Sequence, residues 1–369
     1  MAQFTVPCLF GLEAPTAEDL RRMGLQDVQA ENGRVRFSGD ALSCAKANIR
    51  LRTGERVLLL LGSFFAPDFE ALFQGVRALP LKDYIPKDGK FPVKGYCRNS
   101  ALHSVPDCQK IIKKAAATAL GQAYGTQWLP ETGAMYQLQF SIIKDRCEVY
   151  LDTTGDPLFK RGYRPGHVAA PLRETLAAAI VGFAHYRGRD AFCDPFCGSG
   201  TLAIEAALMA HNRAPGLQRT FSAQNWRAIP AQVWRQAAEE ARALEYPGPY
   251  RIFASDCDPR AVALSRENAR RAGVEKDITF AVADAVQLKA PAEKGVIVCN
   301  PPYGERMMEK DEARKLYQDF GAVTAGLENW QQYIICSDVD FERFYGRTAD
   351  KKRKLYNGML QCNLYMYNK

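Results

Sequence analysis

An alternation of short apolar runs with longer helical patterns fills the C-terminal half of the chain, and it constrains the fold more than any other feature. Runs with the length and β-branched content of buried strands lie at residues 191–196, 251–256, 278–284, 295–300 and 332–338. Patterns with helical spacing lie at 170–189, 201–210 and 259–273. Strands that alternate with helices form a parallel, doubly wound sheet. Two further apolar-alternating runs around Asn357 and Gly358 predict a β-hairpin at one edge of that sheet.

The N-terminal half has a different, mixed pattern. Residues 1–64 predict the order β-α-β-β-α-β, which is the ferredoxin-like split βαβ motif, with a first helix that begins at a Thr16 cap. Residues 65–154 predict two helices followed by two strands. A connector rich in Gly, Pro and Arg follows at 155–170. We therefore expect an α/β protein whose α+β N-terminal units, at 1–64 and 65–154, precede a doubly wound domain at 171–369.

Composition narrows the class of protein. No apolar run is long enough to span a membrane, and the first residues lack the basic start and cleavage site of a signal peptide. The 11 cysteines are scattered without a CxxC pair, which is typical of reduced thiols in the cytoplasm. The 4 histidines show no metal-ligand spacing, so we expect no metal site.

Positive charge is concentrated in one stretch of the N-terminal half. The chain carries a formal net charge of +8, and eight basic residues against three acidic ones lie between Lys82 and Lys114. Such a run is often only a solvated surface, and the alternative is a polyanionic partner. The i, i+3, i+4 spacing of Lys110, Lys113 and Lys114 places these side chains on one face of the helix predicted at 108–125.

Acidic residues and glycines stand at the ends of successive predicted strands. Asp194 opens the stretch DPFCGSGT, in which Gly198 and Gly200 allow a tight turn and a close approach of the backbone to a ligand. Asp256 and Asp284 end the next two strands, and ligands of a doubly wound sheet bind beyond such strand ends. The pattern lacks the lysine of a P-loop and the downstream acid of a dinucleotide site. It therefore favours a nucleoside with an amino-acid tail.

The fourth strand ends in the sequence NPPY at residues 300–303. Pro301 and Pro302 fix their own φ and donate no backbone hydrogen bond, so they make a rigid corner with an amide and an aromatic ring beside them. An Asn-Pro turn can simply end a strand. Beside three strand-end acids, a catalytic role is the better interpretation.

These motifs resemble those of the class I S-adenosylmethionine-dependent amino-methyltransferases. The resemblance implies a Rossmann-like methyltransferase domain with a terminal hairpin, in which the glycine loop holds the methionine end of S-adenosyl-L-methionine, Asp256 the ribose and Asp284 the adenine amine. The implied cofactor-binding residues are Asp194, Phe196, Gly198, Gly200, Thr201, Asp256, Cys257, Asp284, Ala285 and Asn300. The implied catalytic residues are Asn300, Pro301, Pro302 and Tyr303.

The N-terminal half adds a resemblance to RNA-modifying enzymes. The stretch CRNSALHSVPDCQKIIKKA at 97–115 resembles the THUMP domain, an RNA-binding module. DPLFKRGYR at 156–164 and KLYNGMLQC at 354–362 are similar to bacterial THUMP-containing 23S rRNA guanine-N2 methyltransferases. The resemblance implies RNA, and rRNA first, as the partner. The RNA-binding residues that it and the charge indicate are Lys94, Arg98, Lys110, Lys113, Lys114, Arg161 and Arg164.

For a guanine target, NPPY has a simple chemical use. The 2-amino group of guanine is a poor nucleophile because its lone pair is delocalised into the ring. The Asn300 side-chain oxygen and the Pro301 carbonyl can each accept one N–H bond from it, which frees the lone pair toward the methyl group. Tyr303 can stack on the target base, which must be flipped out or already unpaired.

Other interpretations remain open at this point. The chemistry would also serve a tRNA guanine, adenine N6 or a protein glutamine amide, and a pure RNA-binding or ribosome assembly factor is a further alternative. Cys197 could be a nucleophile for pyrimidine methylation, but the motif that faces the base is NPPY, so we expect Cys197 to pack. Trp226 and Trp234 lie in a long insertion after the first helix of the sheet, where we expect them to be packing anchors.

Overall fold

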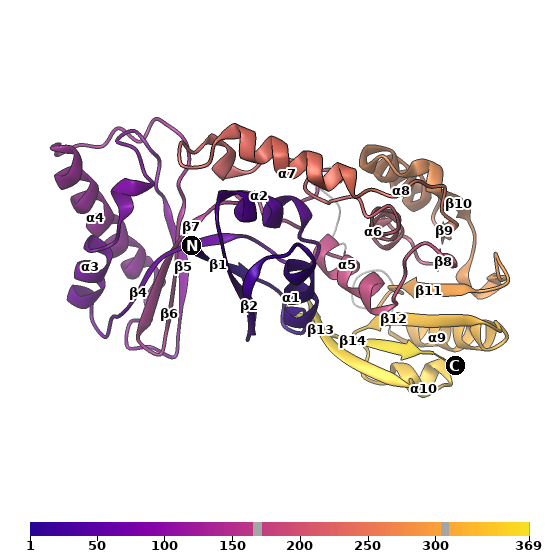
Figure 1. Cartoon of the computed structure of the whole chain (residues 1–369). Helices are drawn as coiled ribbons and strands as arrows, with labels where there is room; N and C mark the ends of the chain where they lie inside the picture. The colour runs from indigo at the N-terminus through magenta and orange to yellow at the C-terminus, as the bar shows by residue number, and fades with distance from the viewer. Residues whose placement is uncertain (165–171, 304–309, 369) are drawn as a thin grey trace.

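The computed structural model describes residues 1–164, 172–303 and 310–368. Over these ranges the chain forms two seven-stranded sheets, one from each half of the sequence (Figure 1). The first sheet has the order β2-β3-β1-β4-β7-β6-β5, and the second has the order β10-β9-β8-β11-β12-β14-β13. No helix in the described part of the chain is both long and apolar enough to cross a bilayer.

The first sheet joins the two expected N-terminal units. Its strands are β1 (Ala2–Pro7), β2 (Gln26–Glu31), β3 (Arg34–Gly39), β4 (Leu58–Phe65), β5 (Val93–Arg98), β6 (Leu138–Ile143) and β7 (Arg146–Asp152). Its helices are α1 (Glu13–Arg22), α2 (Ala41–Arg50), α3 (Phe69–Arg77) and α4 (Val105–Tyr124). The order β-α-β-β-α-β of the first unit is confirmed. Because β4 pairs with β7, the second unit extends the sheet of the first.

Two local expectations for this half are wrong. Helix α1 begins at Glu13, and Thr16 lies inside it with its buried hydroxyl 2.9 Å from that of Thr53, so Thr16 is not the cap. Strand β5, which pairs in parallel with β6, has no counterpart in the sequence interpretation. The sequence does not reveal this strand because several of its residues are small or polar. One of them is Gly95, where a Cβ would lie 2.3 Å from the Phe140 carbonyl oxygen.

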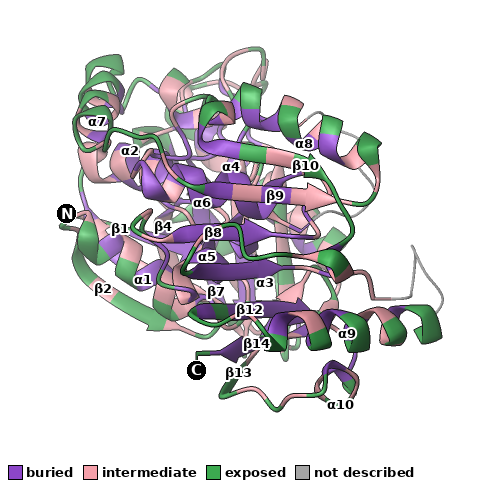
Figure 2. Cartoon of the chain, turned by 90° about the vertical axis from the view of Figure 1, so that its right-hand side faces the viewer, coloured by how far each residue is buried: buried purple, intermediate pink, exposed green. Residues whose placement is uncertain are grey.

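The second sheet is the expected parallel, doubly wound one. Its strands are β8 (Ala191–Asp194), β9 (Ile252–Asp256), β10 (Ile278–Val282), β11 (Gly295–Cys299), β12 (Trp330–Cys336), β13 (Lys351–Asn357) and β14 (Leu360–Tyr367). Its helices are α5 (Glu174–Phe183), α6 (Thr201–Ala210), α7 (Ala231–Ala243), α8 (Pro259–Ala272), α9 (Lys310–Ala325) and α10 (Phe341–Tyr345). The central strands are buried, whereas the outer faces of α8 and α9 are exposed (Figure 2). The hairpin of β13 and β14 closes one edge, as predicted.

The insertion between α6 and β9 packs back onto the N-terminal half. Trp226 stacks on Tyr136 with ring centroids 4.9 Å apart, and Trp234 stacks on Phe221 at 5.3 Å. Both tryptophans are buried, which confirms that they are packing anchors. Helix α7 therefore lies across the junction of the two halves, where an ion pair joins Glu240 to α2 (Figure 1).

Candidate functional site

The strand order reverses between β8 and β11, so the crevice for a ligand lies at the carboxyl ends of these strands. Asp194 ends β8, Asp256 ends β9, Asp284 follows β10 and Asn300 follows β11. All four strands are parallel, and Asp256 is in register with Val282 while Asp194 is in register with Ala254. The structure therefore places the four residues along one edge of the sheet, as the sequence predicts.

Gly198 and Gly200, in the loop after β8, have different structural roles. Both have positive φ, +49° at Gly198 and +83° at Gly200. A Cβ on Gly200 would lie 2.2 Å from Ser265 Oγ, so this glycine allows the start of α6 to pack on α8. A Cβ on Gly198 would meet nothing within 4 Å, so the backbone here faces open space that a ligand can enter.

Asp194 is a buried carboxyl group with a second acid nearby. Its side chain accepts a hydrogen bond from the Phe196 amide at 3.2 Å. Burial, and to a smaller degree the charge of Asp256, raise the pKa of Asp194 to about 8. A cationic ligand beside it would favour the ionised form. The sulfonium and ammonium groups of S-adenosylmethionine have that charge, so the residues present fit this cofactor.

Asp256 and Asp284 both accept hydrogen bonds from backbone amides. Asp256 accepts from the Gly198 amide at 2.9 Å through one oxygen and from the Asp258 amide at 3.0 Å through the other. Each carboxylate oxygen keeps a further lone pair for a ribose hydroxyl. Asp284 is exposed and caps a short 3₁₀ turn through the Val286 amide at 3.1 Å. Its outer oxygen is therefore accessible to an amine.

Apolar and polar neighbours complete this edge. Phe196 packs edge-on against Phe320 of α9 with ring centroids 5.0 Å apart, and Ala285 is buried beside the same aromatic cluster. Cys257 is exposed, and the buried Thr201 hydroxyl lies 3.3 Å from Arg164 Nη1. The cofactor roles assigned to these residues from the sequence stay predictions.

The NPPY corner is held by tyrosine hydroxyls. Tyr317 of α9 donates to the Pro302 carbonyl at 2.7 Å, and the Tyr303 hydroxyl donates to Asn300 Oδ1. The Tyr303 ring packs into two apolar clusters of the domain, and burial raises its pKa well above the usual value. In this conformation the Tyr303 ring is partly buried, and its hydroxyl occupies the oxygen that we expect to act on the target amine. Residues 304–306 of the same stretch lie outside the described residues.

The basic residues predicted to bind RNA fall into three groups. Lys94, Arg98, Lys110 and Lys114 are exposed. Lys113 is engaged within the fold, because its ammonium group pairs with Glu131 at 2.6 Å and lies 3.4 Å from the centre of the Phe91 ring.

The third group consists of Arg161 and Arg164, which lie in the connector. Arg161 is 3% exposed and donates to the Arg52 carbonyl at 2.5 Å and the Leu158 carbonyl at 2.8 Å, so the prediction that it contacts RNA is wrong. Arg164 donates to Glu174 at 2.8 Å and is largely buried, which corrects its assignment in the same way.

Sequence reasoning missed two buried polar residues, one that holds the glycine loop and one that holds the connector. Asn268, fully buried on α8, donates to the Ser199 carbonyl at 2.9 Å. Glu205, fully buried on α6, accepts from Arg161 at 3.4 Å and from the Tyr163 hydroxyl at 3.2 Å. A polar residue on the apolar face of a predicted helix is the signal that could have found both. Cys197, by contrast, is buried with a raised pKa, which supports its packing role.

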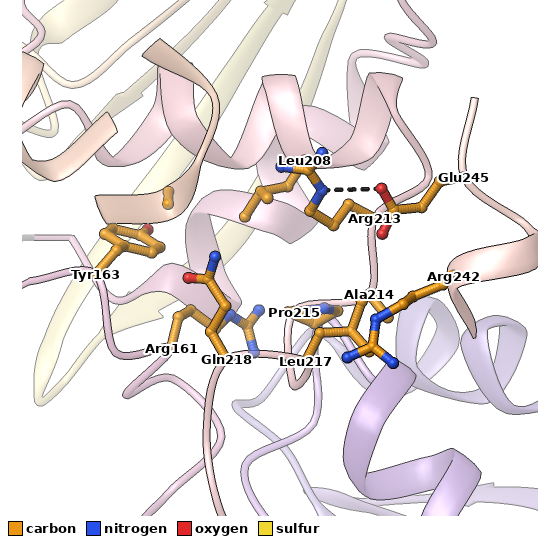
Figure 3. A pocket seen from close by; sticks show the side chains of 11 residues that line it. Arg161, Tyr163, Leu208, Arg213, Ala214, Pro215, Leu217, Gln218, Arg242 and Glu245 are labelled. Carbon is orange, nitrogen blue, oxygen red and sulfur yellow. Dashed lines mark hydrogen bonds and ion pairs between the residues drawn. The ribbon is translucent and has the colours of Figure 1, made fainter. Parts of the chain in front are cut away.

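A cavity of about 430 Å³ lies away from this edge, between the connector, α6 and α7 (Figure 3). Arg161, Tyr163 and Gln218 line it, together with Arg213, which pairs with Glu245 at 3.0 Å. Helix α6 has 10 residues and runs from the glycine loop toward the cavity, which is a separation of roughly 15 Å. The cavity is therefore distinct from the strand-end site. In the described ranges, no cluster of three or more His, Cys, Asp or Glu residues could hold a metal ion.

Three family models match the chain, each over a different part. The model described as an RMKL-like methyltransferase domain matches residues 161–366, the RlmL ferredoxin-like domain matches 3–58 and the THUMP domain matches 66–152. The methyltransferase match begins within the stretch 155–170, which the sequence predicts to be a connector, and the domain boundaries stay predictions.

Similar proteins extend over the whole chain. The Bacillus subtilis (strain 168) protein named "Putative RNA methyltransferase YpsC" is 43% identical over 97% of this chain and 93% of its own length. The ribosomal RNA large subunit methyltransferase K/L of Syntrophotalea carbinolica is 32% identical over 97% of this chain, which spans 52% of that relative.

Solved structures with the same fold are also close in sequence. A "predicted N6-adenine-specific DNA methylase" from Listeria monocytogenes is 41% identical, with a TM-score of 0.94 over 100% of this chain and 96% of that one. SMU.472, named as a "putative methyltransferase" and complexed with SAH, is 39% identical, with a TM-score of 0.94 over 99% of this chain and 97% of that one.

Proposed function

The chain belongs to the RMKL-like methyltransferase family, and from this premise we propose that it methylates an exocyclic base amine of RNA, with guanine N2 of 23S rRNA as the target. Its cofactor is S-adenosyl-L-methionine. The observation that carries the proposal is the position of Asn300, at a rigid corner on the same strand-end edge as Asp194 and Gly198. RNA as the substrate is supported by the THUMP match and by the names of the relatives.

The residues of this edge have separate roles in the proposal. Asp256 and Asp284 orient the nucleoside part of the cofactor, while Asp194 and the Gly198 backbone face its amino-acid end. The bound cofactor supplies an electrophilic methyl group on a sulfonium. Asn300 Oδ1 and the Pro301 carbonyl accept the two N–H bonds of the target amine, which directs its lone pair toward the methyl carbon. For this step the Tyr303 hydroxyl must release Asn300 Oδ1.

Atoms and charge balance in a single displacement. The amine nitrogen forms its bond to the methyl carbon as the carbon–sulfur bond breaks, and the electron pair of that bond goes to sulfur. The amine then loses one proton to water. No residue becomes covalently modified, so a buried, protonated thiol such as Cys197 has no part in the reaction.

One experiment tests the proposal and its main alternative. The purified protein is incubated with bacterial rRNA and isotope-labelled S-adenosylmethionine, and the nucleosides are identified by mass spectrometry. We expect label in N2-methylguanosine of 23S rRNA. Adenine N6 is the second candidate, because the similar Listeria monocytogenes structure is named as an N6-adenine methylase, and label in N6-methyladenosine would replace the first target with it. Absence of label from the rRNA would contradict both.

A further inference from the structure

One face of the N-terminal sheet carries a groove of about 530 Å³ that the proposed chemistry does not use. Residues of β1, β3, β5, β6 and β7 line it, so it crosses from the ferredoxin-like unit into the THUMP unit. We propose that this groove binds an unpaired segment of RNA and that its contact surface continues along β13 to the NPPY edge. The inference rests on the proposed RNA substrate and adds where and in what form the RNA is captured.

The strand alternation of β5 separates the groove from the apolar core. Lys94, Tyr96 and Arg98 are exposed, whereas Cys97 points the other way, toward Cys108 of α4 at 3.8 Å between sulfur atoms. The parallel register sets Gln139 and Ser141 of β6 beside this exposed row. The floor near β5 and β6 is therefore polar.

The floor on the opposite side is an ordered network of arginines. Glu148 accepts from Arg34 and from Arg36, each at 2.6 Å, and from the Tyr150 hydroxyl at 2.7 Å. Both arginine side chains remain about one-fifth exposed. Their orientation is set before any ligand arrives, which lowers the entropic cost of binding a phosphate.

Charge on this face favours a polyanion. The strands place Arg34, Arg36, Lys94, Arg98 and Arg146 there against Glu31, Glu148 and Asp152. The cations of these strands therefore exceed the carboxylates by two, and the charge of Asp152 is further paired with Arg56. An excess of positive charge is not required for solvation of a surface, whereas the phosphate groups of a bound RNA would neutralise it.

Exposed aromatic rings lie at both ends of the groove. Tyr96 is 50% exposed on β5 and Phe10 is 49% exposed beside the turn after β2, where it packs on Gly33. Rings of this kind are stacking platforms for bases that are not paired. Bases inside a duplex present no free faces, so rings combined with cations select single-stranded over double-stranded RNA.

Phe10 also connects the groove to the methyltransferase domain. Its ring lies edge-on to Tyr356 of β13 with centroids 6.4 Å apart, and the Lys354 ammonium lies 5.5 Å from the centre of the Tyr356 ring. A Cβ on Gly11 would lie 2.9 Å from the Lys354 carbonyl oxygen, so the backbones of the two halves are in contact here.

The hairpin then leads to the catalytic edge. Strand β14 pairs antiparallel with β12 such that Asn363 lies opposite Cys336, the last residue of β12. The hairpin connection, with its fully exposed Met359, therefore lies at the carboxyl ends of the parallel strands, where Asn300 stands. Phe10, Tyr356 and the hairpin connection thus link one end of the groove to the strand-end edge of the second sheet.

Fluorescence anisotropy with the full-length protein tests the inference, using an unstructured twelve-nucleotide RNA and a hairpin RNA of the same composition as probes. We expect tighter binding of the unstructured probe. Tyr96→Ala and Phe10→Ala should each weaken it by about 5- to 150-fold, the range for loss of one base-stacking side chain. Tyr96→Phe keeps the ring and should retain the affinity. Tyr246→Ala, which removes a 61% exposed tyrosine outside the groove, is the matched control and should have no effect.

The possible outcomes separate this inference from the function it rests on. S-adenosylmethionine binding and the circular dichroism spectrum should be unchanged in all variants, which shows that they are folded. If the parent protein binds neither probe, the proposed RNA substrate itself is contradicted. If the parent binds the unstructured RNA and both alanine variants bind it equally well, the groove is not the capture site. In that case the groove would be assigned to a protein partner instead of RNA.

Discussion

The two sheets of this chain offer ligands opposite kinds of surface. Strands β8 and β11 of the second sheet are buried along their whole length on both faces, so only the strand ends are accessible. Strand β5 of the first sheet alternates between half-buried and exposed residues, so one face is accessible along its length. A sheet edge brings a few side chains and amides together at one point, which suits chemistry on a small cofactor. A sheet face spreads contacts over many strands, which suits capture of an extended polymer.

The largest expected effect is a loss of methyl transfer at the strand-end edge of the second sheet, while RNA binding at the face of the first sheet is unchanged. Asn300→Ala should lower kcat for methyl transfer by about 100- to 1000-fold, because its oxygen acts on the amine in the transition state. Binding of S-adenosylmethionine and RNA should change little. Single-turnover kinetics with calorimetric titration of the cofactor would measure both.

Tyr303→Phe is the matched control for that change. It keeps the ring and removes the hydroxyl that occupies Asn300 Oδ1, so activity should be retained. If Asn300→Ala instead lost cofactor affinity and kept its turnover at saturation, Asn300 would be a cofactor ligand and not a catalytic residue.

The next effect concerns cofactor binding at the same edge. Asp256→Ala should weaken S-adenosylmethionine binding by about 10- to 100-fold, since a hydrogen bond to a charged group contributes about 1.5–3 kcal/mol. The nearby Asp258 caps α8 through the Arg260 amide, so Asp258→Ala should cost little affinity and serves as the control. Equal affinities of Asp256→Ala and the parent in calorimetry would refute the ribose assignment.

A smaller effect should appear in the pH dependence of cofactor binding. With a pKa of about 8 in the free protein, Asp194 is largely protonated at pH 6 to 7, and a bound sulfonium favours its ionised form. Binding should therefore release up to one proton and tighten as pH rises toward 8, by at most about tenfold per unit. Calorimetry in two buffers of different ionisation enthalpy measures the proton. Asp194→Asn should remove the dependence, and a parent protein whose affinity is flat from pH 6 to 8 would contradict the assignment.

What the sequence could predict differs between the two sheets for a physical reason. The parallel half is encoded locally, in strand runs, helix runs and motifs at strand ends, so the sequence predicts its parallel, doubly wound character and the strand-end positions of Asp194, Asp256 and Asp284, but not the order of its strands. Partners far apart in the sequence are not encoded in this way. Arg161 is a surface arginine by its sequence neighbours, but the fold places it beside Glu205, which lies 44 positions further along the chain. The inward turn of Tyr303 and the pairing of β4 with β7 depend on packing in the same way.

The smallest expected effect concerns the basic helix α4, where the structure divides three lysines that look equivalent in the sequence. Lys114 is exposed, and Lys110 is exposed with only a long surface pair to Asp107 at 3.5 Å, whereas Lys113 is held by Glu131 at 2.6 Å. Ammonium groups that remain accessible to phosphates release counterions on binding. Replacing Lys110 and Lys114 with Ala should therefore lower RNA affinity a few-fold and flatten its salt dependence by up to about two contacts. The helix should persist, because Ala is the better helix former.

Lys113→Ala is the variant that sharpens this last comparison. It removes an ion pair and a contact with the Phe91 ring, so it should lower the melting temperature and leave the salt dependence of RNA binding close to that of the parent. Anisotropy with structured RNA at several salt concentrations, beside thermal unfolding, distinguishes the two kinds of lysine. If the double variant keeps the parent's affinity and slope, this helix face is a solvated surface. Electrostatic capture would then rest on the sheet face of Arg34, Lys94 and Arg98.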